Sequence, residues 1–367
     1  MAANQSSSRG FAKSAMILLA FAGICATPAR AAASADHLAL ANSSRPLSLK
    51  SNAVLVVDQD SGQTLLAKNP DTVVPIASLT KLMTALVVLD AHQPMDEELQ
   101  VTADDTDSFR HSSSRLAVGT RLDRSQMLLL ALMSSENRAA LSLSRNYPGG
   151  RRAFIAQMNA KAKALGMTPT HFADPAGLSN DSVSTARDLH RLLSAAYAQP
   201  LIRADSTHPE EVMRIGRRNL TFLNTNRLAR RQSGDWDIQV QKTGFTNEAG
   251  RCLVMQVKVM GHRLSMIFLD SVGTLTRFAD AQRVRQHLQL EANAVVHSVA
   301  ASAALPVSGA ACAASRATAT RIRFLPPTSA LVGSNSIQPA PGRNTCTQAW
   351  VAPPPTTPDS APIRASS

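Results

Sequence analysis

The stretch "VPIASLTKLMTALVVLD", residues Val74 to Asp90, predicts a helix that buries one face. Its large apolar residues recur at spacings of three and four, which is the period of a partly buried helix (Leu79, Leu82, Met83 and Leu86). Ser78 and Lys81 stand at its start, beside that apolar face. Because side chains three residues apart share one face of a helix, we expect the serine hydroxyl and the lysine amine to touch.

This contact has a chemical use only under a particular condition. A serine hydroxyl is a weak nucleophile at neutral pH and needs a neighbouring base to take its proton. Lys81 can be that base only if its amine is neutral. Burial and a second cation would both lower the pKa of Lys81, and Lys242 is the candidate for that cation. Taken alone, the pair is more typical of a solvated helix flank, where serine and lysine are common.

Two further polar motifs follow along the chain. Ser135 and Asn137 end an apolar helix in "MSSENRAA", and Lys242, Thr243 and Gly244 end a strand in "QVQKTGFTNEAG". The order Ser-x-x-Lys, Ser-x-Asn and Lys-Thr-Gly, with serine-to-serine and serine-to-lysine spacings of 57 and 107 residues, matches the motifs of penicillin-binding proteins and serine β-lactamases. Coincidence is a poor explanation for an ordered triple.

Each position of these motifs has a task in acyl transfer. Ser135 can relay a proton between Lys81 and the leaving nitrogen, while Asn137 can fix the substrate amide. Lys242 and Thr243 can hold a carboxylate. The catalytic candidates are therefore Ser78, Lys81 and Ser135, and the substrate-binding candidates are Asn137, Lys242, Thr243, Gly244 and Phe245.

Two backbone features complete the predicted site. Gly244 has no side chain, so a substrate backbone can lie against its strand. The amides of Ser78 and Phe245 are predicted to form the oxyanion hole, because a helix start and a strand edge both present unpaired N–H groups.

The chain from about residue 49 to residue 295 resembles the low-molecular-mass penicillin-binding proteins, which are serine D-Ala-D-Ala peptidases of the S11 type. The segments "ALMSSENRAA", "NYPGG" and "KTGFTNEAGRCLVM" resemble the D-alanyl-D-alanine endopeptidase branch of that family. The resemblance implies a transpeptidase fold like that of penicillin-binding proteins and β-lactamases. It also implies an acyl-enzyme on Ser78, peptidoglycan cross-links as substrate and β-lactams as covalent inhibitors, with no cofactor or metal.

Endopeptidase and D-Ala-D-Ala carboxypeptidase activities both remain open, because both cut after a D-Ala carbonyl. Glu136 inside the second motif favours the endopeptidase by resemblance. The Pro-rich C-terminal segment also resembles neither the second, β-rich domain nor the amphipathic anchor of the carboxypeptidase branch. A slowly acylating β-lactam-binding or sensing module needs the same three motifs and stays an alternative of another class.

Other enzyme classes find less support in the sequence. A class A β-lactamase needs a glutamate between the second and third motifs to drive deacylation, and residues 138–209 contain no Glu. The sequence has no His-Glu-x-x-His motif for zinc, no Gly-x-Ser-x-Gly elbow and no phosphate-binding loop. The nine histidines are scattered, so none is predicted to bind a metal.

The first 31 residues predict export. Arg9 and Lys13 precede the apolar run "SAMILLAFAGICAT", and Ala29-Arg30-Ala31 has the form of a cleavage site. We therefore expect a signal peptide over residues 1–31 and a periplasmic protein. Ile24 before Cys25 argues against a lipoprotein, because a small residue is wanted there.

The net charge favours anionic surfaces in the cell envelope, although a compositional bias, with thirty Arg against eight Lys, explains it more simply. The formal charge is +12, and loss of three basic residues with the signal leaves 12 − 3 = +9. Contact with a membrane or an anionic polymer would be peripheral at most. Nucleic acid is not expected, because no basic stripe with interleaved aromatic residues occurs.

Domain organisation follows from composition. We expect a flexible segment at 32–48, a catalytic domain at 49–295 and a flexible tail at 296–367. Residues 301–367 hold ten of the twenty prolines, no lysine and one acidic residue. A bridge between Cys312 and Cys346 stays possible, whereas Cys252 is expected to be a buried strand residue.

The order of predicted elements favours an α+β domain, an antiparallel sheet flanked by a helical cluster. The predicted order begins with an opening hairpin at 52–69 and helices from 78 and at 123–135, 149–166 and 184–199. Four late strands follow at 218–226, 236–245, 250–261 and 262–271, and a closing helix is predicted at 276–290. The late strands are expected to pair with the opening hairpin.

Overall fold

The computed structural model describes residues 47–107, 110, 112–230 and 236–303, with side chains up to residue 294. The predicted signal peptide, almost all of the N-terminal segment, and the tail from residue 304 with Cys312 and Cys346 lie outside the described residues. Their assignments therefore remain predictions.

One antiparallel sheet of five strands carries the fold, in the order β2-β1-β11-β10-β9. Its strands are β1 (Ser51–Asp58), β2 (Thr64–Lys68), β9 (Asp237–Thr246), β10 (Gly250–Val259) and β11 (His262–Ser271). The opening hairpin thus pairs with the last strand, as predicted, because β1 lies beside β11 with Leu55 opposite Ile267.

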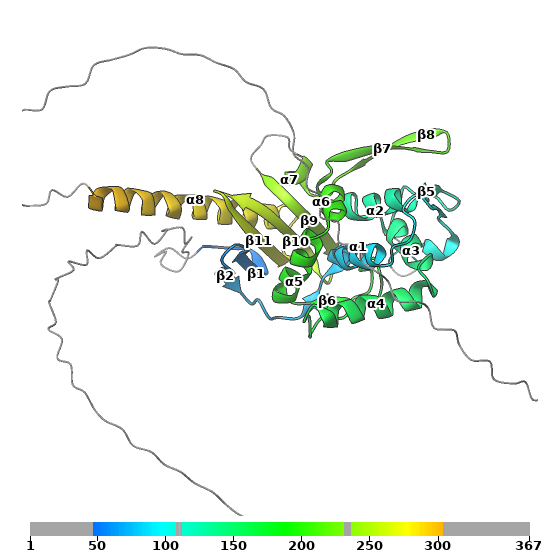
Figure 1. The fold of residues 1–367 in the computed structure, drawn as a ribbon, viewed down its shortest axis with the longest axis horizontal. Coiled ribbons are helices and arrows are strands. Elements are labelled where there is room, and N and C mark those ends of the chain that lie inside the picture. Colours follow the sequence, from blue (N-terminus) through cyan, green and yellow to red (C-terminus); the bar gives the residue numbers. More distant parts are fainter. Residues whose placement is uncertain (1–46, 108–109, 111, 231–235, 304–367) are drawn as a thin grey trace, which may run out of the picture. The chain divides into compact units, whose positions relative to one another are not determined.

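Helices cover both faces of this sheet (Figure 1). On one face Leu253, Met255 and Phe268 pack with Phe278 and Val284 of α8 (Thr276–Ala303). On the other face the core continues into the helical cluster. In β10 and β11 the side chains on both faces of the sheet are therefore apolar, as expected for strands that are buried on two sides.

The helical cluster surrounds α1 (Lys81–Asp90), which is buried from Lys81 to Val88. Its other members are α2 (Arg124–Met133), α3 (Asn137–Arg145), α4 (Gly150–Ala164), α5 (Ala186–Tyr197) and α6 (Pro200–Thr207). Side chains fix two of the helix starts. Asp123 and Gln126 form a capping box before α2, and Thr185 accepts a hydrogen bond from the Asp188 amide at α5.

Three features differ from the sequence-based prediction. β8 (Arg218–Leu223) does not join the main sheet, because it pairs with β7 (Glu210–Ile215) in a separate hairpin that turns at Gly216. The short helix α6 was not predicted, and α3 is a helix separate from α2, which ends at Met133. The closing helix begins at Thr276 as predicted but continues to Ala303 instead of ending at Leu290.

The remaining elements are short. They are β3 (Val74–Pro75), β4 (Glu98–Gln100), β5 (Arg121–Asp123), β6 (Val183–Ser184), α7 (Arg227–Arg230) and two 3₁₀ turns at Ala77–Thr80 and Ala103–Asp105. Among the described residues, no helix is both long enough and apolar enough to span a bilayer.

Candidate active site

Ser78 lies in the 3₁₀ turn Ala77–Thr80 that leads into α1, so the α-helix itself begins three residues later than predicted. Ala77 adopts a left-handed conformation with φ 47°, which is costly for a residue with a Cβ and is often found beside functional groups. The backbone of Gly177 packs directly on Ala77, and a Cβ at residue 177 would lie 1.9 Å from the Ala77 carbonyl oxygen. Close packing therefore fixes the backbone before Ser78.

The Lys81 amine contacts three partners at once. Its Nζ lies 2.9 Å from Ser78 Oγ, 2.8 Å from Asn137 Oδ1 and 2.7 Å from the carbonyl oxygen of Ala176. The Lys81 side chain is fully buried, whereas Ser78 is half-buried. The predicted contact between Ser78 and Lys81 is present in the structure, and it includes Asn137 of the second motif.

Burial lowers the pKa of Lys81 to about 7, although the carboxylates of Asp174 and Glu136 raise it. Removing an ammonium group from water disfavours its charged form. The predicted direction is thus found, but with burial as the main cause. Lys242 was predicted to lower the pKa of Lys81. In the structure the effect is found on the pKa of Lys242, which Lys81 lowers. A substantial fraction of Lys81 is neutral at pH 7 and able to accept a proton.

Ser135 and Asn137 lie where α2 gives way to α3. Ser135 has a left-handed backbone with φ 62°, and Asn137 is the first residue of α3. Between them, buried Glu136 accepts hydrogen bonds from Ser114 Oγ (2.6 Å) and from the Arg115 amide (3.2 Å). Glu136 therefore joins the motif to the segment that precedes β5.

That same segment supplies a further contact to Asn137. Asn137 Nδ2 donates a hydrogen bond to Ser112 Oγ over 2.8 Å. Since Asn137 Oδ1 contacts Lys81, the two ends of its amide are both engaged, which orients the group. Sequence reasoning missed Ser112, because one serine in a Ser-rich stretch carries no signal of its own.

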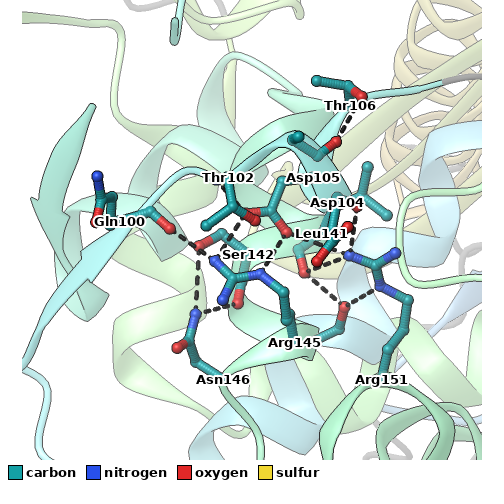
Figure 2. A network of polar contacts seen from close by, with 12 residues as sticks. Gln100, Thr102, Asp104, Asp105, Thr106, Leu141, Ser142, Arg145, Asn146 and Arg151 are labelled. Carbon is teal, nitrogen blue, oxygen red and sulfur yellow. Dashed lines mark hydrogen bonds and ion pairs between the residues drawn. The ribbon is translucent and has the colours of Figure 1, made fainter. Parts of the chain in front are cut away.

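A buried ion-pair network anchors the start of this segment (Figure 2). The carboxylate of Asp105 is fully buried and contacts Arg145 Nε at 3.0 Å and Arg151 Nη2 at 3.2 Å. Asp105 also closes a capping box with Thr102. Because Arg145 ends the helix that Asn137 begins, the network connects α3 to the 3₁₀ turn ahead of Ser112.

The third motif lies on β9, the edge strand of the sheet. A Cβ at Gly244 would lie 2.9 Å from the Ile76 carbonyl oxygen and 3.3 Å from the Ser78 amide nitrogen. The absence of a side chain at Gly244 therefore brings the strand close to the Ser78 amide. Phe245 follows and is 49% exposed, with Arg251 stacked 4.1 Å from its ring centre.

Lys242 and Thr243 are both buried on this strand. Lys242 Nζ donates to the Thr243 carbonyl oxygen over 3.0 Å, and Thr243 Oγ1 lies 2.6 Å from Thr225 Oγ1. Burial, then Lys81 and then Arg277 hold the pKa of Lys242 well below its ordinary value. Arg277, whose pKa of about 10 keeps it charged at neutral pH, contributes a positive potential near the third motif, where an anionic group of a substrate would be stabilised.

Asp174 organises the loop that carries Ala176. Its carboxylate accepts hydrogen bonds from the amides of Ala176, Leu178 and Ser179 at 2.8 to 3.0 Å. It also accepts one from Ser182 Oγ at 3.2 Å. The loop thereby holds the Ala176 carbonyl against Lys81. The sequence "DPAGLS" has the composition of a turn, which is the signal that could have located it.

A possible metal-binding group lies elsewhere. Asp58, Asp60 and His262 bring three ligand atoms within 4.8 Å of one another among the described residues. Their contacts are accounted for by the hairpin, because Asp58 caps the turn amides and Asp60 pairs with Arg263. These residues do not belong to the site around Ser78.

Comparison with known proteins assigns the family. The family model of peptidase S11, described as D-alanyl-D-alanine carboxypeptidase, matches residues 40–273. The chain belongs to the peptidase S11 family. A D-alanyl-D-alanine endopeptidase of Pseudomonas aeruginosa is 52% identical over 243 residues, which are 66% of this chain and 78% of the relative. A D-alanyl-D-alanine endopeptidase of Escherichia coli is 45% identical over 274 residues, 74% of this chain and 87% of the relative.

A solved structure of this S11 fold supports the assignment. Penicillin-binding protein D2 of Listeria monocytogenes, in its cefotaxime-bound form, superposes with a TM-score of 0.58 at 30% identity. The match covers 66% of this chain and 99% of that chain. The predicted α+β fold of an S11 peptidase is thereby confirmed.

Proposed function

We propose that this S11 peptidase is a serine DD-peptidase that hydrolyses D-alanyl bonds of peptidoglycan through an acyl-enzyme on Ser78. The observation that carries the proposal is the buried Lys81 amine, which contacts Ser78 Oγ at 2.9 Å and Asn137 Oδ1 at 2.8 Å. The first two motifs meet at this amine, whose pKa of about 7 suits it to act as a base, and Gly244 of the third motif packs beside the Ser78 amide.

The proposed reaction begins with proton transfer. Neutral Lys81 accepts the proton of the Ser78 hydroxyl as Oγ attacks the carbonyl carbon of D-Ala. The amides of Ser78 and Phe245 stabilise the oxyanion, and Ser135 passes the proton to the leaving nitrogen. Water then hydrolyses the ester and restores Ser78.

Substrate binding uses the rest of the site. Asn137 orients the amide of the acyl portion. Lys242 and Thr243 bind the carboxylate on the leaving group, and Gly244 admits the substrate backbone beside β9. A D-Ala-D-Ala end and a D-Ala–diaminopimelate cross-link both carry a carboxylate on the carbon next to the scissile nitrogen. The third motif therefore serves both substrates and does not select between them.

We favour the cross-link as the substrate, which makes the enzyme an endopeptidase. Support comes from two relatives at 52% and 45% identity that are both named D-alanyl-D-alanine endopeptidase. Covalent inhibition by β-lactams is supported by the cefotaxime-bound state of the Listeria protein. Export through residues 1–31 would deliver the enzyme to the periplasm, where the excess of basic residues favours peripheral contact with anionic envelope polymers.

Digestion of purified sacculi tests this proposal. We expect cross-linked muropeptide dimers to be converted to monomers, with Ser78→Ala inactive. Release of free D-alanine without loss of dimers would instead identify a carboxypeptidase. Acylation by penicillin with no product from either bond would identify a β-lactam-binding module and contradict the proposal.

A further inference from the structure

Arg110 joins three segments near the site through an ion pair and two hydrogen bonds. Arg110 donates through Nε to the Leu178 carbonyl oxygen and through Nη2 to Asn180 Oδ1. Its Nη1 lies 2.9 Å from Glu248 Oε2, in the turn between β9 and β10. The Glu248 side chain is 44% exposed and that of Arg110 is 18% exposed, so solvent reaches both charges.

Each of these segments leads within a few residues to the reacting groups. Ser112, two residues from Arg110, contacts Asn137. Ala176, two residues before Leu178, contacts Lys81. Glu248 follows Phe245 by three residues. Because residues 247–249 form a turn, the extended-chain advance of about 3.3–3.6 Å per residue sets an upper limit, and Glu248 lies within roughly 11 Å of Phe245.

The direction of β9 places this pair on the acyl side of the scissile bond. This step rests on the proposed function, in which Thr243 binds the leaving-group carboxylate and the Phe245 amide binds the oxyanion. Passing along β9 from Thr243 to Phe245 moves from the leaving group to the carbonyl. Continuing in the same direction to Glu248 therefore follows the peptide that becomes the acyl-enzyme.

That peptide carries a complementary charge pair at a suitable distance. The residue before its terminal D-Ala is diaminopimelate, whose side chain ends in a free amino group and a free carboxylate on one carbon. One peptide unit of about 3.8 Å and three methylene carbons separate this carbon from the D-Ala residue, which amounts to roughly 9 Å. We propose that Arg110 and Glu248 form the subsite for this zwitterionic end, Arg110 binding the carboxylate and Glu248 binding the ammonium.

Binding would exchange one set of ion pairs for another. In the free protein Arg110 and Glu248 neutralise each other, and in the complex each faces the opposite charge of the ligand. No charge is left unpaired, so the desolvation cost is limited. The planar guanidinium also suits two-point contact with a carboxylate. Glu248 is ionised for this role, because its own backbone amide and the side chains of Arg110 and Asn180 lower its pKa.

The test uses two synthetic thioester donors with the same leaving group. Their third residue is meso-diaminopimelate in one and L-lysine in the other, so that they differ by the side-chain carboxylate alone. Acylation is followed by thiol release. For the wild type we expect kcat/KM to be about tenfold higher for the diaminopimelate donor. Tenfold corresponds to the lower end of what one hydrogen bond to a charged group contributes. In Arg110→Gln the two donors should differ by less than about twofold.

Glu248→Gln is a second variant, because it leaves the contacts of Lys81 with Ser78, Asn137 and Ala176 in place. Both donors carry the ammonium group, so we expect kcat/KM to fall for both while their ratio is kept. Benzylpenicillin has no third residue, and its acylation rate should be unchanged in Glu248→Gln. Arg121→Gln, which removes an exposed ion pair with Glu98, is the matched control and should match the wild type.

Each outcome has a defined meaning. Equal wild-type rates with the two donors would overturn the subsite while leaving the proposed function intact. No acylation by either donor or by benzylpenicillin would overturn the proposed function itself. If Arg110→Gln also lost penicillin acylation, Glu248→Gln would decide, and unchanged stem-peptide kinetics in that variant would refute the subsite.

Discussion

Gly177 and Ala77 approach so closely that a Cβ at residue 177 would lie 1.9 Å from the Ala77 carbonyl oxygen. The loop organised by Asp174 is therefore pressed against the residue before the nucleophile. This contact explains how two segments about a hundred positions apart in sequence present Ser78 and the Ala176 carbonyl to the same lysine. It also makes the geometry of the site sensitive to one methyl group.

We predict that Gly177→Ala loses most acylation and most of its stability, because the clash involves backbone atoms that cannot rotate away. Gly62→Ala is the matched control. Gly62 has nearly the same φ, 74° against 73°, but nothing lies within 4 Å of its added Cβ. The control should lose only about 1–2 kcal/mol of unfolding free energy, the cost of a left-handed backbone. Equal losses in urea unfolding of the two variants would show that strain, and not the contact, matters at Gly177.

The two lysines should respond differently to replacement by arginine. Lys81→Arg places a permanent charge where a neutral base is required, so acylation should be abolished for every substrate. Lys242→Arg supplies a permanent cation for the substrate carboxylate, so partial activity should remain, with the loss concentrated on benzylpenicillin. Acylation rates with benzylpenicillin and with a neutral ester analogue provide the measurement. Identical losses in both variants on both substrates would mean that the base is misassigned.

Acylation should rise with pH through about 7, where Lys81 loses its proton. Below that pH the neutral fraction, and with it the rate, should fall about tenfold per pH unit. Asp174→Asn removes a carboxylate that raises the pKa of Lys81, so its midpoint should move to lower pH. Stopped-flow measurement with benzylpenicillin from pH 5 to about 9 checks both curves. A midpoint that moves to higher pH in Asp174→Asn would contradict the assignment of Lys81 as the titrating base.

Asp205 predicts a pH dependence of stability. Burial raises the pKa of Asp205 to about 7, against the opposing effect of His208, and its Oδ2 has no hydrogen-bond partner. Between pH 4 and 7 the folded state holds more protons than the unfolded state, so this group makes stability fall as pH rises. Asp205→Asn should therefore raise unfolding free energy at pH 8 by on the order of 2–4 kcal/mol, with little change near pH 4. Thermal unfolding at both pH values measures this, and a larger gain at pH 4 would reverse the sign.

The sequence predicted much of the main sheet because its apolar runs are long and their turns are marked. Cys252 is buried in β10, as predicted. The position of β8 could not be predicted, since "RNLTFLNTN" has strand character but nothing in it specifies β7 as its partner. The residues of the three motifs could be named in advance because their chemistry is unusual for their surroundings.

The supporting residues of the site were not predicted, for a different physical reason. Asp174 and Ser112 act through hydrogen bonds to distant segments, and such contacts leave no local pattern in one sequence. Arg277 near Lys242 likewise belongs to the closing helix, for which the sequence predicted no role in the site. Burial is the main cause of the low pKa of Lys81, and it results from several elements that pack around this side chain. The periodicity of α1 alone does not specify that packing.

In the proposed mechanism Ser78 is the nucleophile and Lys81 activates it. Intact-mass and peptide mass spectrometry after incubation with benzylpenicillin test this most directly, with Ser78→Ala as the comparison at equal circular dichroism. We expect one penicilloyl adduct, on the peptide that contains Ser78, and no adduct on Ser78→Ala. An adduct on another serine, or labelling that persists in folded Ser78→Ala, would contradict it.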